Sequence, residues 1–206
     1  MASCLKYISA RMRNSEVLPR LILELTSVCQ VKCVWCLMQT FNKIRKRHMP
    51  FERFVRFIEI NGDYLRRNNT AVTPFSRGEP LIYPHFWQCC SIMRENGLAL
   101  DSIATNLSMK ISVDDFLANP FNYIVVNLGG VTREVHEGVM INSNFKLVTK
   151  NLRELWAAGI PVRVKINPCR ANIHQLPLLP DFVERLGGRR EYAERYQTLF
   201  PHPDDM

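Results

Sequence analysis

The sequence predicts an α/β fold, in which a mainly parallel sheet forms a partial, open β/α barrel of about five to six βα units. Short apolar runs alternate along the chain with segments whose apolar residues recur at helical spacing, a pattern typical of βα units. Polar or glycine-rich segments follow each apolar run, namely TSVC, SRGEP, TNLS, NLGG and NPCRAN. Right-handed crossovers place the carboxyl ends of all these strands on one rim, where parallel sheets bind ligands. Five units cannot close an eight-stranded barrel, so either the sheet is open or the barrel is shortened.

The first two units follow from apolar patterning. Segment 21–26 is a short apolar run that suits a buried strand, and segment 50–65 opens with Pro50 and repeats apolar residues at helical spacing. Segment 71–75 is a second short run, and a helix is expected at 84–95. The SRGEP turn joins this strand to its helix.

Three further units are expected in the same order, each a strand followed by a helix: 98–105 with 111–118, 123–128 with 145–158, and 161–167 with 174–186. Segment 123–128, YIVVNL, is the clearest strand because it is mostly apolar and rich in β-branched residues. Gly159 is expected to end the helix before it. The chain therefore divides into an N-terminal segment 1–20, a core 21–188 and a short tail 189–206.

Composition excludes several classes of protein. The 206 residues are 47% hydrophobic and 22% charged, as in an ordinary globular domain. No run approaches 18 uninterrupted apolar residues, so we expect no membrane span. The seven cysteines are an odd number, and the first residues lack the apolar stretch of a secretory signal. Both features favour a reducing compartment, and we expect a cytoplasmic protein.

The net charge of +8 leaves two interpretations open. The densest basic run is NKIRKRHM, residues 42–49. It is either a solvated loop or a surface that attracts an anionic partner such as RNA. No nucleic-acid motif accompanies the run, so the solvated loop is the favoured interpretation.

Three of the seven cysteines lie within eight residues. Cys29, Cys33 and Cys36 have CxxxCxxC spacing directly after the first strand. Three thiolates are one ligand short of a closed zinc site and one short of full protein ligation of a four-iron cluster. No spacing recommends a fourth ligand among the remaining cysteines, which are Cys4, Cys89, Cys90 and Cys169. The alternative is a coordination position left open for chemistry. Cys89 and Cys90 are expected to fill core space on a helix.

This triplet, with Trp35 before its last cysteine, resembles the radical S-adenosylmethionine enzymes, and further segments match that family in order. FSRGEPLIYP (75–84) is similar to its GGEP segment, and ATNLS (104–108) to its TNG-type segment. VVNLGGVTREVHE (125–137) and INPCRANIHQLPLL (166–179) resemble the segments after the fourth and fifth strands. The resemblance runs from about residue 21 to 188. It is nearest to the branch that often carries a cysteine-rich C-terminal extension, which this sequence lacks.

The resemblance implies a [4Fe–4S] cluster held by the cysteine triplet, whose open iron takes the amino and carboxylate groups of S-adenosylmethionine. It implies reductive cleavage of that cofactor and hydrogen abstraction from a substrate by the 5′-deoxyadenosyl radical. It assigns the cofactor contacts to seven residues: Trp35, Gly78, Glu79, Asn106, Asn127, Lys165 and Asn172.

Elementary chemistry agrees with most of these assignments. The carboxylate of Glu79 suits the ammonium group, and Gly78 allows close approach of the backbone. Asn106 and Asn127 can donate and accept hydrogen bonds to ribose hydroxyls or the carboxylate. Trp35 offers an apolar face to adenine. Either Lys165 or Arg163 places one cation toward the carboxylate.

The same residues also have ordinary interpretations. Glu79 is a plain loop acid and the asparagines are turn formers if the cysteines are set aside. His136 is more typical of a surface or capping residue than of a ligand, and Cys169 is favoured as a core or loop thiol. Two positions depart from the family pattern: Arg77 replaces the first glycine of GGEP, and Asn127 with Gly129 replaces a customary serine and aspartate.

We expect the substrate to be a peptide or a small metabolite and the electron donor to resemble flavodoxin or ferredoxin. A partner subunit is a further possibility, because it would complete the open barrel. The alternative functions are modification of tRNA or another RNA, activation of a glycyl-radical enzyme, and metal binding without catalysis.

Overall fold

The five predicted strands pair in parallel, as expected. The computed structural model describes residues 18–36 and 46–193. Within these ranges one two-stranded and one three-stranded parallel sheet form: β1 (Arg20–Ile22) with β3 (Ala71–Thr73), and β4 (Ser102–Thr105), β5 (Tyr123–Leu128) and β7 (Val162–Ile166) in that spatial order. A parallel bridge between Val72 and Leu100 joins the two sheets. The strand order is therefore β1-β3-β4-β5-β7.

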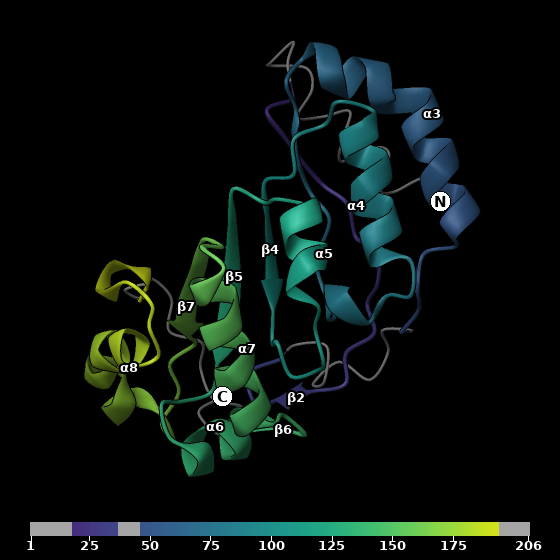
Figure 1. Ribbon diagram of the computed structural model, residues 1–206. Coiled ribbons are helices and arrows are strands. Elements are labelled where there is room, and N and C mark those ends of the chain that lie inside the picture. The colour runs from purple at the N-terminus through teal and green to yellow at the C-terminus, as the bar shows by residue number, and fades with distance from the viewer. Residues whose placement is uncertain (1–17, 37–45, 194–206) are drawn as a thin grey trace.

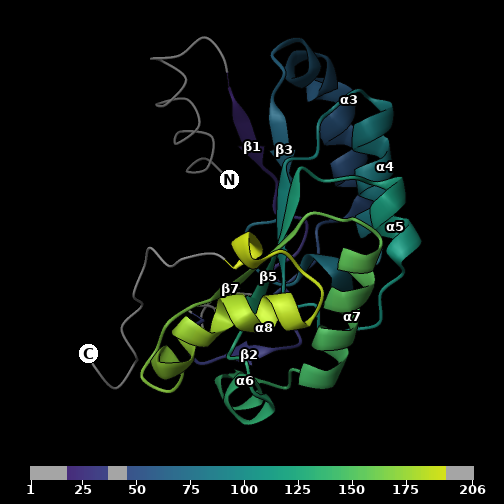
Figure 2. The ribbon, with the colours of Figure 1, turned by 60° about the vertical axis from the view of Figure 1, so that its left-hand side comes forward.

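Helices cover one side of these strands (Figure 2). They are α3 (Phe51–Arg67), α4 (Phe86–Glu95), α5 (Val113–Ala118) and α7 (Phe145–Ala157). In α3 the buried Phe54, Ile58 and Leu65 lie on one face, because three- and four-residue spacings share a helix face. The main apolar core lies between these helices and the strands. The opposite face of β5, which carries Tyr123 and Val125, is only half-buried.

A side-chain cap and a glycine set the two ends of α7, and the glycine was expected. The Asn144 side chain accepts a hydrogen bond from the Leu147 N–H at 2.9 Å, which caps the first turn. Gly159 follows the helix with a φ of 75°, a conformation that glycine adopts without strain. Beyond α7, the helix α8 (Leu179–Arg185) packs beside it through the stacked rings of Phe145 and Phe182.

The five predicted strands and four of the five predicted helices are present, with ends that differ by a few residues. The exception is 174–186, which divides into a 3-10 helix η2 (Ile173–Leu178) and α8. Pro177 and Pro180 lie within that segment and lack the backbone N–H that a continuous helix needs.

Five short elements were not predicted: β2 (Lys32–Cys33), η1 (Pro80–Ile82), α6 (Arg133–Val139), β6 (Met140–Ile141) and η3 (Arg190–Tyr192). Elements of two or three residues are too short for periodicity to show. In Figure 1, β2, β6 and α6 lie together beyond the lower end of β4. That end is the carboxyl end of the strand, where the predicted site belongs.

The described residues contain no closed barrel. After α8 the chain makes a single parallel bridge, between Ala193 and Val164 of β7, where a sixth strand would begin. Most of the predicted segment 1–20, residues 42–45 of the basic run, and the tail beyond residue 193 lie outside the described residues. The described residues form no helix long and apolar enough to cross a membrane.

Candidate functional site

The three cysteines of the triplet lie together at the carboxyl rim. Cys29 follows the first strand, Cys33 ends β2, and the Cys36 N–H donates to the Cys33 carbonyl at 3.0 Å. All three thiols are half-buried. Burial raises the pKa of the Cys33 thiol, and the charges of Cys29 and Cys36 raise it further. Cys29 and Cys36 are thus near enough to Cys33 to influence its thiol electrostatically.

Cys29 is tied to the segment that follows β4. Burial raises the pKa of its thiol, while hydrogen bonds from the Val31 N–H and the Asn106 side chain oppose that rise. Asn106 Nδ2 lies 3.7 Å from the sulfur, and Gln30 Nε2 donates to Asn106 Oδ1 at 3.1 Å. Asn106 therefore contacts a predicted cluster ligand directly, and its predicted contact with S-adenosylmethionine stays a prediction.

Glu79 is almost completely buried, with 1% of its surface exposed. Its carboxylate accepts hydrogen bonds from Thr105 Oγ1 and the Asn106 N–H, both at 2.7 Å, and from the Leu81 N–H at 3.2 Å. Burial raises its pKa to about 7, although these hydrogen bonds oppose the rise. Glu79 therefore joins the loop after β3 to the end of β4, a role that the sequence did not reveal.

Gly78 lies against the loop that leads to the cysteines. Its φ is 72°, and a Cβ there would lie 2.6 Å from the Val28 carbonyl oxygen. The next residue, Glu79, donates its N–H to the same oxygen at 2.8 Å. The structure thus shows a close backbone approach at Gly78 to the segment 26–28 of this chain, and the predicted approach to S-adenosylmethionine stays a prediction.

Arg77 pairs with Glu24, two residues beyond the end of β1. Its Nε and Nη2 donate to the two carboxylate oxygens of Glu24 at 2.7 and 3.0 Å, a bidentate pair. This pair is partly exposed at the surface. Arg77, which replaces the first glycine of GGEP, therefore adds a surface ion pair with Glu24.

Asn127 and Lys165 are neighbours at the ends of β5 and β7, because they are paired in register. Among the described residues, Asn127 Oδ1 is the buried side-chain polar atom without a hydrogen-bond partner. A buried acceptor of this kind is costly unless a ligand or water satisfies it. Lys165 is half-buried beside it. The two side chains provide an acceptor and a cation on one face of the sheet.

Asn172 is fully buried and joins two loops of the rim. Its Nδ2 donates to the carbonyls of Gly129 at 2.9 Å and Asn167 at 3.0 Å, and its Oδ1 accepts from the Cys169 N–H at 2.7 Å. Both donors of the amide are used within the chain, so the contacts shown by the structure are structural. Trp35 is half-buried between Cys33 and Cys36.

Cys4 lies outside the described residues, and the other three cysteines beyond the triplet are buried, as expected. Cys89 and Cys90 are buried on α4 within the core. Burial raises the pKa of the Cys89 thiol to about 12, which keeps it neutral. Cys169 is buried in the loop after β7.

Two buried polar residues at the rim have a role that sequence reasoning missed. His136 is fully buried and accepts the Gly129 N–H at Nδ1, at 3.2 Å. Gln175 accepts the Val131 N–H at 2.7 Å. Both hold the NLGG segment. A Cβ on Gly129 would lie 2.5 Å from the His136 carbonyl oxygen, so glycine is required there by close packing. The two adjacent glycines of NLGG were the feature of the sequence that indicated this close backbone approach.

The residues present fit a cluster with S-adenosylmethionine. The donor set is three thiols at one rim, and the nearby strand ends carry an unsatisfied acceptor at Asn127. Within the described ranges, no group of three or more His, Cys, Asp or Glu side chains is arranged to hold a metal ion. In an iron–sulfur cluster each thiolate binds a different iron, so the three sulfurs need not meet at a single point.

No protein-family model and no curated protein matches the sequence. Solved structures do match. SuiB of Streptococcus suis, bound to S-adenosylmethionine, aligns over 89% of this chain and 42% of its own, with a TM-score of 0.66 and 16% identity. anSMEcpe with bound AdoMet aligns over 81% and 48%, also with a TM-score of 0.66 and 16% identity. Archaeal TYW1 aligns over 86% and 66%, with a TM-score of 0.51 and 14% identity.

These three proteins are radical S-adenosylmethionine enzymes. The chain therefore has the fold of that superfamily, and the resemblance noted from its motifs is confirmed at the level of the fold. The chain spans about two fifths of the length of SuiB.

Proposed function

We propose that this chain is a radical S-adenosylmethionine enzyme with one [4Fe–4S] cluster, built on an open β/α barrel. One observation carries the proposal: three cysteine thiols and the unsatisfied Oδ1 of Asn127 lie at the same carboxyl rim. When bound, such a cluster supplies the single electron that cleaves S-adenosylmethionine and so starts hydrogen abstraction.

The chain's own residues are proposed to bind and orient the cluster and S-adenosylmethionine. Cys29, Cys33 and Cys36 are the proposed iron ligands. Asn127 and Lys165 are proposed to receive the polar groups of S-adenosylmethionine, because one is an unsatisfied acceptor and the other a cation beside it. Trp35 and Asn106 flank the cysteines and are proposed to line the same site.

Three of the seven predicted cofactor residues are proposed to act mainly by holding loops. Gly78 and Glu79 fix the segment after β3 against the cysteine loop, and Asn172 joins the loops after β5 and β7. Fixed loops limit the reorganisation that binding would otherwise require.

The substrate is proposed to lie on the sheet face opposite the described helices α3, α4, α5 and α7. In β5 the side chains of this face, Tyr123, Val125 and Asn127, are half-buried, whereas their neighbours are buried in the core. Arg163 of β7 lies over the Tyr123 ring on the same face, at 4.3 Å. A peptide is the favoured substrate class, since SuiB was solved with its precursor peptide SuiA and anSMEcpe with the Cp18Cys peptide.

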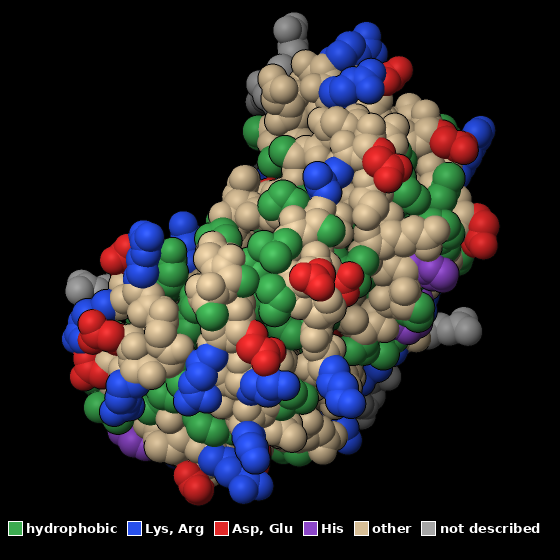
Figure 3. Space-filling model, in the orientation of Figure 1, with side chains coloured by type: hydrophobic (Ala, Val, Ile, Leu, Met, Phe, Trp, Pro, Cys, Tyr) green, Lys and Arg blue, Asp and Glu red, His purple; other side chains and the backbone are tan. Residues whose placement is uncertain are grey.

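RNA modification is the second candidate, favoured by the net charge of +8. α7 exposes Lys146, Lys150 and Arg153, and Figure 3 shows Lys and Arg side chains gathered over the lower part of this face. Acidic side chains lie among them, which weakens the attraction for a phosphate backbone. Binding to bulk tRNA that falls steeply with salt would favour this candidate, and its absence would exclude it.

The test is anaerobic reconstitution of the full chain with iron and sulfide. We expect about four irons per chain and a brown chromophore, and 5′-deoxyadenosine after addition of dithionite and S-adenosylmethionine. Cys33→Ala should abolish the chromophore, whereas the matched Cys90→Ala variant should keep it, because Cys90 lies in the core. Stoichiometric zinc without iron, or a cluster that yields no 5′-deoxyadenosine, would contradict the proposal.

A further inference from the structure

The cysteine loop is held by a two-stranded antiparallel ribbon that the motif does not encode. β2 pairs with β6, with Lys32 opposite Ile141 and Cys33 opposite Met140. The Val34 N–H continues the ladder by donating to the Val139 carbonyl at 3.0 Å. The backbone at Cys33 is therefore fixed by a segment far along the chain, and its position depends on how firmly β6 is held.

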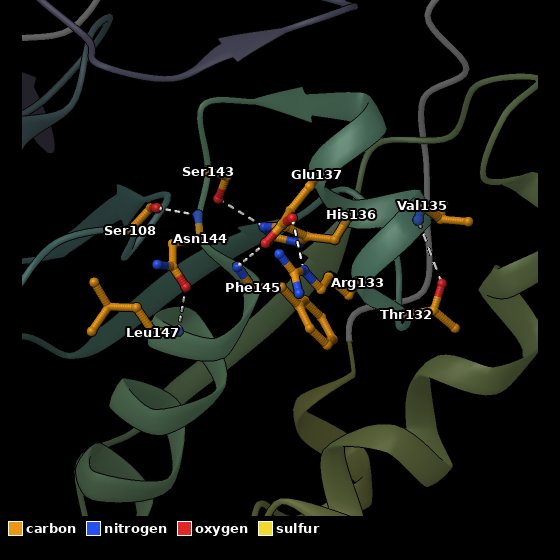
Figure 4. Close-up of polar contacts among 10 residues, drawn as sticks. All are labelled: Ser108, Thr132, Arg133, Val135, His136, Glu137, Ser143, Asn144, Phe145 and Leu147. Carbon is orange, nitrogen blue, oxygen red and sulfur yellow. Dashed lines mark hydrogen bonds and ion pairs between the residues drawn. The ribbon is translucent and has the colours of Figure 1, made fainter.

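β6 is itself held at both ends by buried contacts (Figure 4). Before it, α6 carries the fully buried His136. After it, the Ser143 N–H donates to the Met140 carbonyl at 2.9 Å, which closes a turn. His136 Nε2 lies 2.8 Å from Ser143 Oγ, so the imidazole joins the two ends of the segment that contains β6.

The protonation of His136 is set by its partners. The Gly129 N–H donates to Nδ1, so Nδ1 carries no proton and Nε2 is the nitrogen that donates to Ser143. Burial lowers the pKa of His136 to about 4, although the neighbouring Glu137 opposes this. Glu137 also accepts from Arg133 and from the Phe145 N–H. The neutral imidazole therefore has both nitrogens paired.

The same corner is anchored to the segment after β4. Ser108 Oγ accepts the Asn144 N–H at 2.7 Å, and the Ser108 N–H donates to Asn106 Oδ1 at 2.9 Å. Asn106 in turn contacts Cys29. Both Cys29 and Cys33 are thus connected to residues 136–144, the first through side chains and the second through the ribbon.

We propose that His136 is a positioning residue for the cysteine loop: by joining Gly129 to Ser143 it fixes β6, and through the β2–β6 ribbon it fixes Cys33. The importance of this role for catalysis rests on the proposed function. The mechanical connection between His136 and Cys33 does not, and it is tested separately.

The first experiment uses the cluster-free full chain. Iodoacetamide labelling is followed at each cysteine by mass spectrometry, together with hydrogen exchange at the Val34 amide. His136→Phe keeps a ring but removes both polar contacts. We expect it to speed labelling of Cys33 by about tenfold and to speed exchange at Val34, as loss of a buried hydrogen bond opens the ribbon locally.

Cys90 is the internal reference, because it is buried on α4 away from the ribbon and becomes accessible only when the core opens. Its labelling rate should not change in His136→Phe. Equal acceleration of Cys33 and Cys90, or no acceleration of either, would refute the positioning role. If His136→Phe does not fold, Ser143→Ala tests the positioning role instead. It removes one of the two polar contacts of His136 and should speed labelling of Cys33 by a smaller factor.

The second experiment uses the reconstituted protein. His136→Phe should alter the electron paramagnetic resonance signal of the reduced cluster, whereas the Cys90→Ala control should leave it unchanged. His136→Gln, which can still reach Ser143, should restore part of the wild-type signal. An unaltered signal in His136→Phe would refute a role at the cluster. Failure of the wild type to form any cluster would instead refute the proposed function and leave the labelling result to decide the connection.

Discussion

The buried carboxylate of Glu79 makes the stability of the cluster-free chain depend on pH in a defined direction. Burial raises its pKa from an ordinary value of 4.5 to about 7. Between these two values the folded chain holds a proton that the unfolded chain has lost, so stability falls as pH rises. The contribution is fully present below about pH 4.5 and is lost as the pH passes about 7.

Glu79→Gln removes this titration and keeps the size of the side chain. A shift from 4.5 to about 7 corresponds to about 3 kcal/mol. We therefore expect the stability of the variant, relative to the wild type, to increase by about 3 kcal/mol between pH 4.5 and pH 7.5. The variant should be the less stable protein at the acidic end, because both oxygens of the protonated carboxyl can still accept hydrogen bonds, whereas the amide nitrogen of Gln cannot accept one.

Another buried group, His136, changes the stability with pH in the opposite direction. Its effect cancels when Glu79→Gln is compared with the wild type. Burial lowers the pKa of His136 to about 4, so its contribution to stability is lost as the pH falls from about 6.5 toward 4. Both proteins contain His136, so this term cancels in the difference between them.

The assay is urea denaturation of both cluster-free proteins, followed by circular dichroism from pH 4.5 to 8. Glu59→Gln makes the same chemical change on the exposed side of α3 and should show no pH-dependent difference of this size. A difference between Glu79→Gln and wild type that stays constant with pH would refute the reasoning, because the carboxyl group would then titrate alike in the folded and unfolded chains.

Three further substitutions test the contacts of the rim by thermal or chemical denaturation. Gly129→Ala should destabilise by about 1–3 kcal/mol, because its Cβ would lie 2.5 Å from the His136 carbonyl oxygen. Asn172→Ala should cost about 2–4 kcal/mol, since it leaves two buried backbone groups and one part-buried group without their partner. Arg77→Ala should cost less than about 1 kcal/mol and leave cluster content unchanged, because the pair with Glu24 is partly exposed and includes none of the proposed ligands. A large loss of cluster in Arg77→Ala, or a neutral Asn172→Ala, would contradict these assignments.

Most of the secondary structure could be predicted because it follows from the local spacing of apolar residues. β5 begins and ends where its apolar run does, and α3 follows the spacing of Phe54, Ile58 and Leu65. Two-residue strands such as β2 and β6 carry no periodic signal, since their pairing depends on residues far apart in the chain. Segment 174–186 was predicted as one helix although two prolines interrupt it.

The candidate site was predictable in its residue types but only in part in its contacts. The cysteine spacing indicated a three-thiol donor set, and the structure brings those thiols to the expected rim. Asn127 keeps an unsatisfied acceptor there, in agreement with a ligand contact. Glu79 and Asn172 were expected to contact the cofactor, and the contacts that the structure shows for them lie within the chain.

The sequence by itself determined the α/β alternation, the three thiols and the rim on which they lie, because these depend on spacing along the chain and on the fixed handedness of βα units. The tertiary structure alone decided which groups are satisfied and what holds the loops. Burial of His136, the turn of Arg77 toward Glu24 and the ribbon at Cys33 all arise from contacts between distant segments. No local pattern encodes such contacts, since they exist only when packing has removed water from both partners.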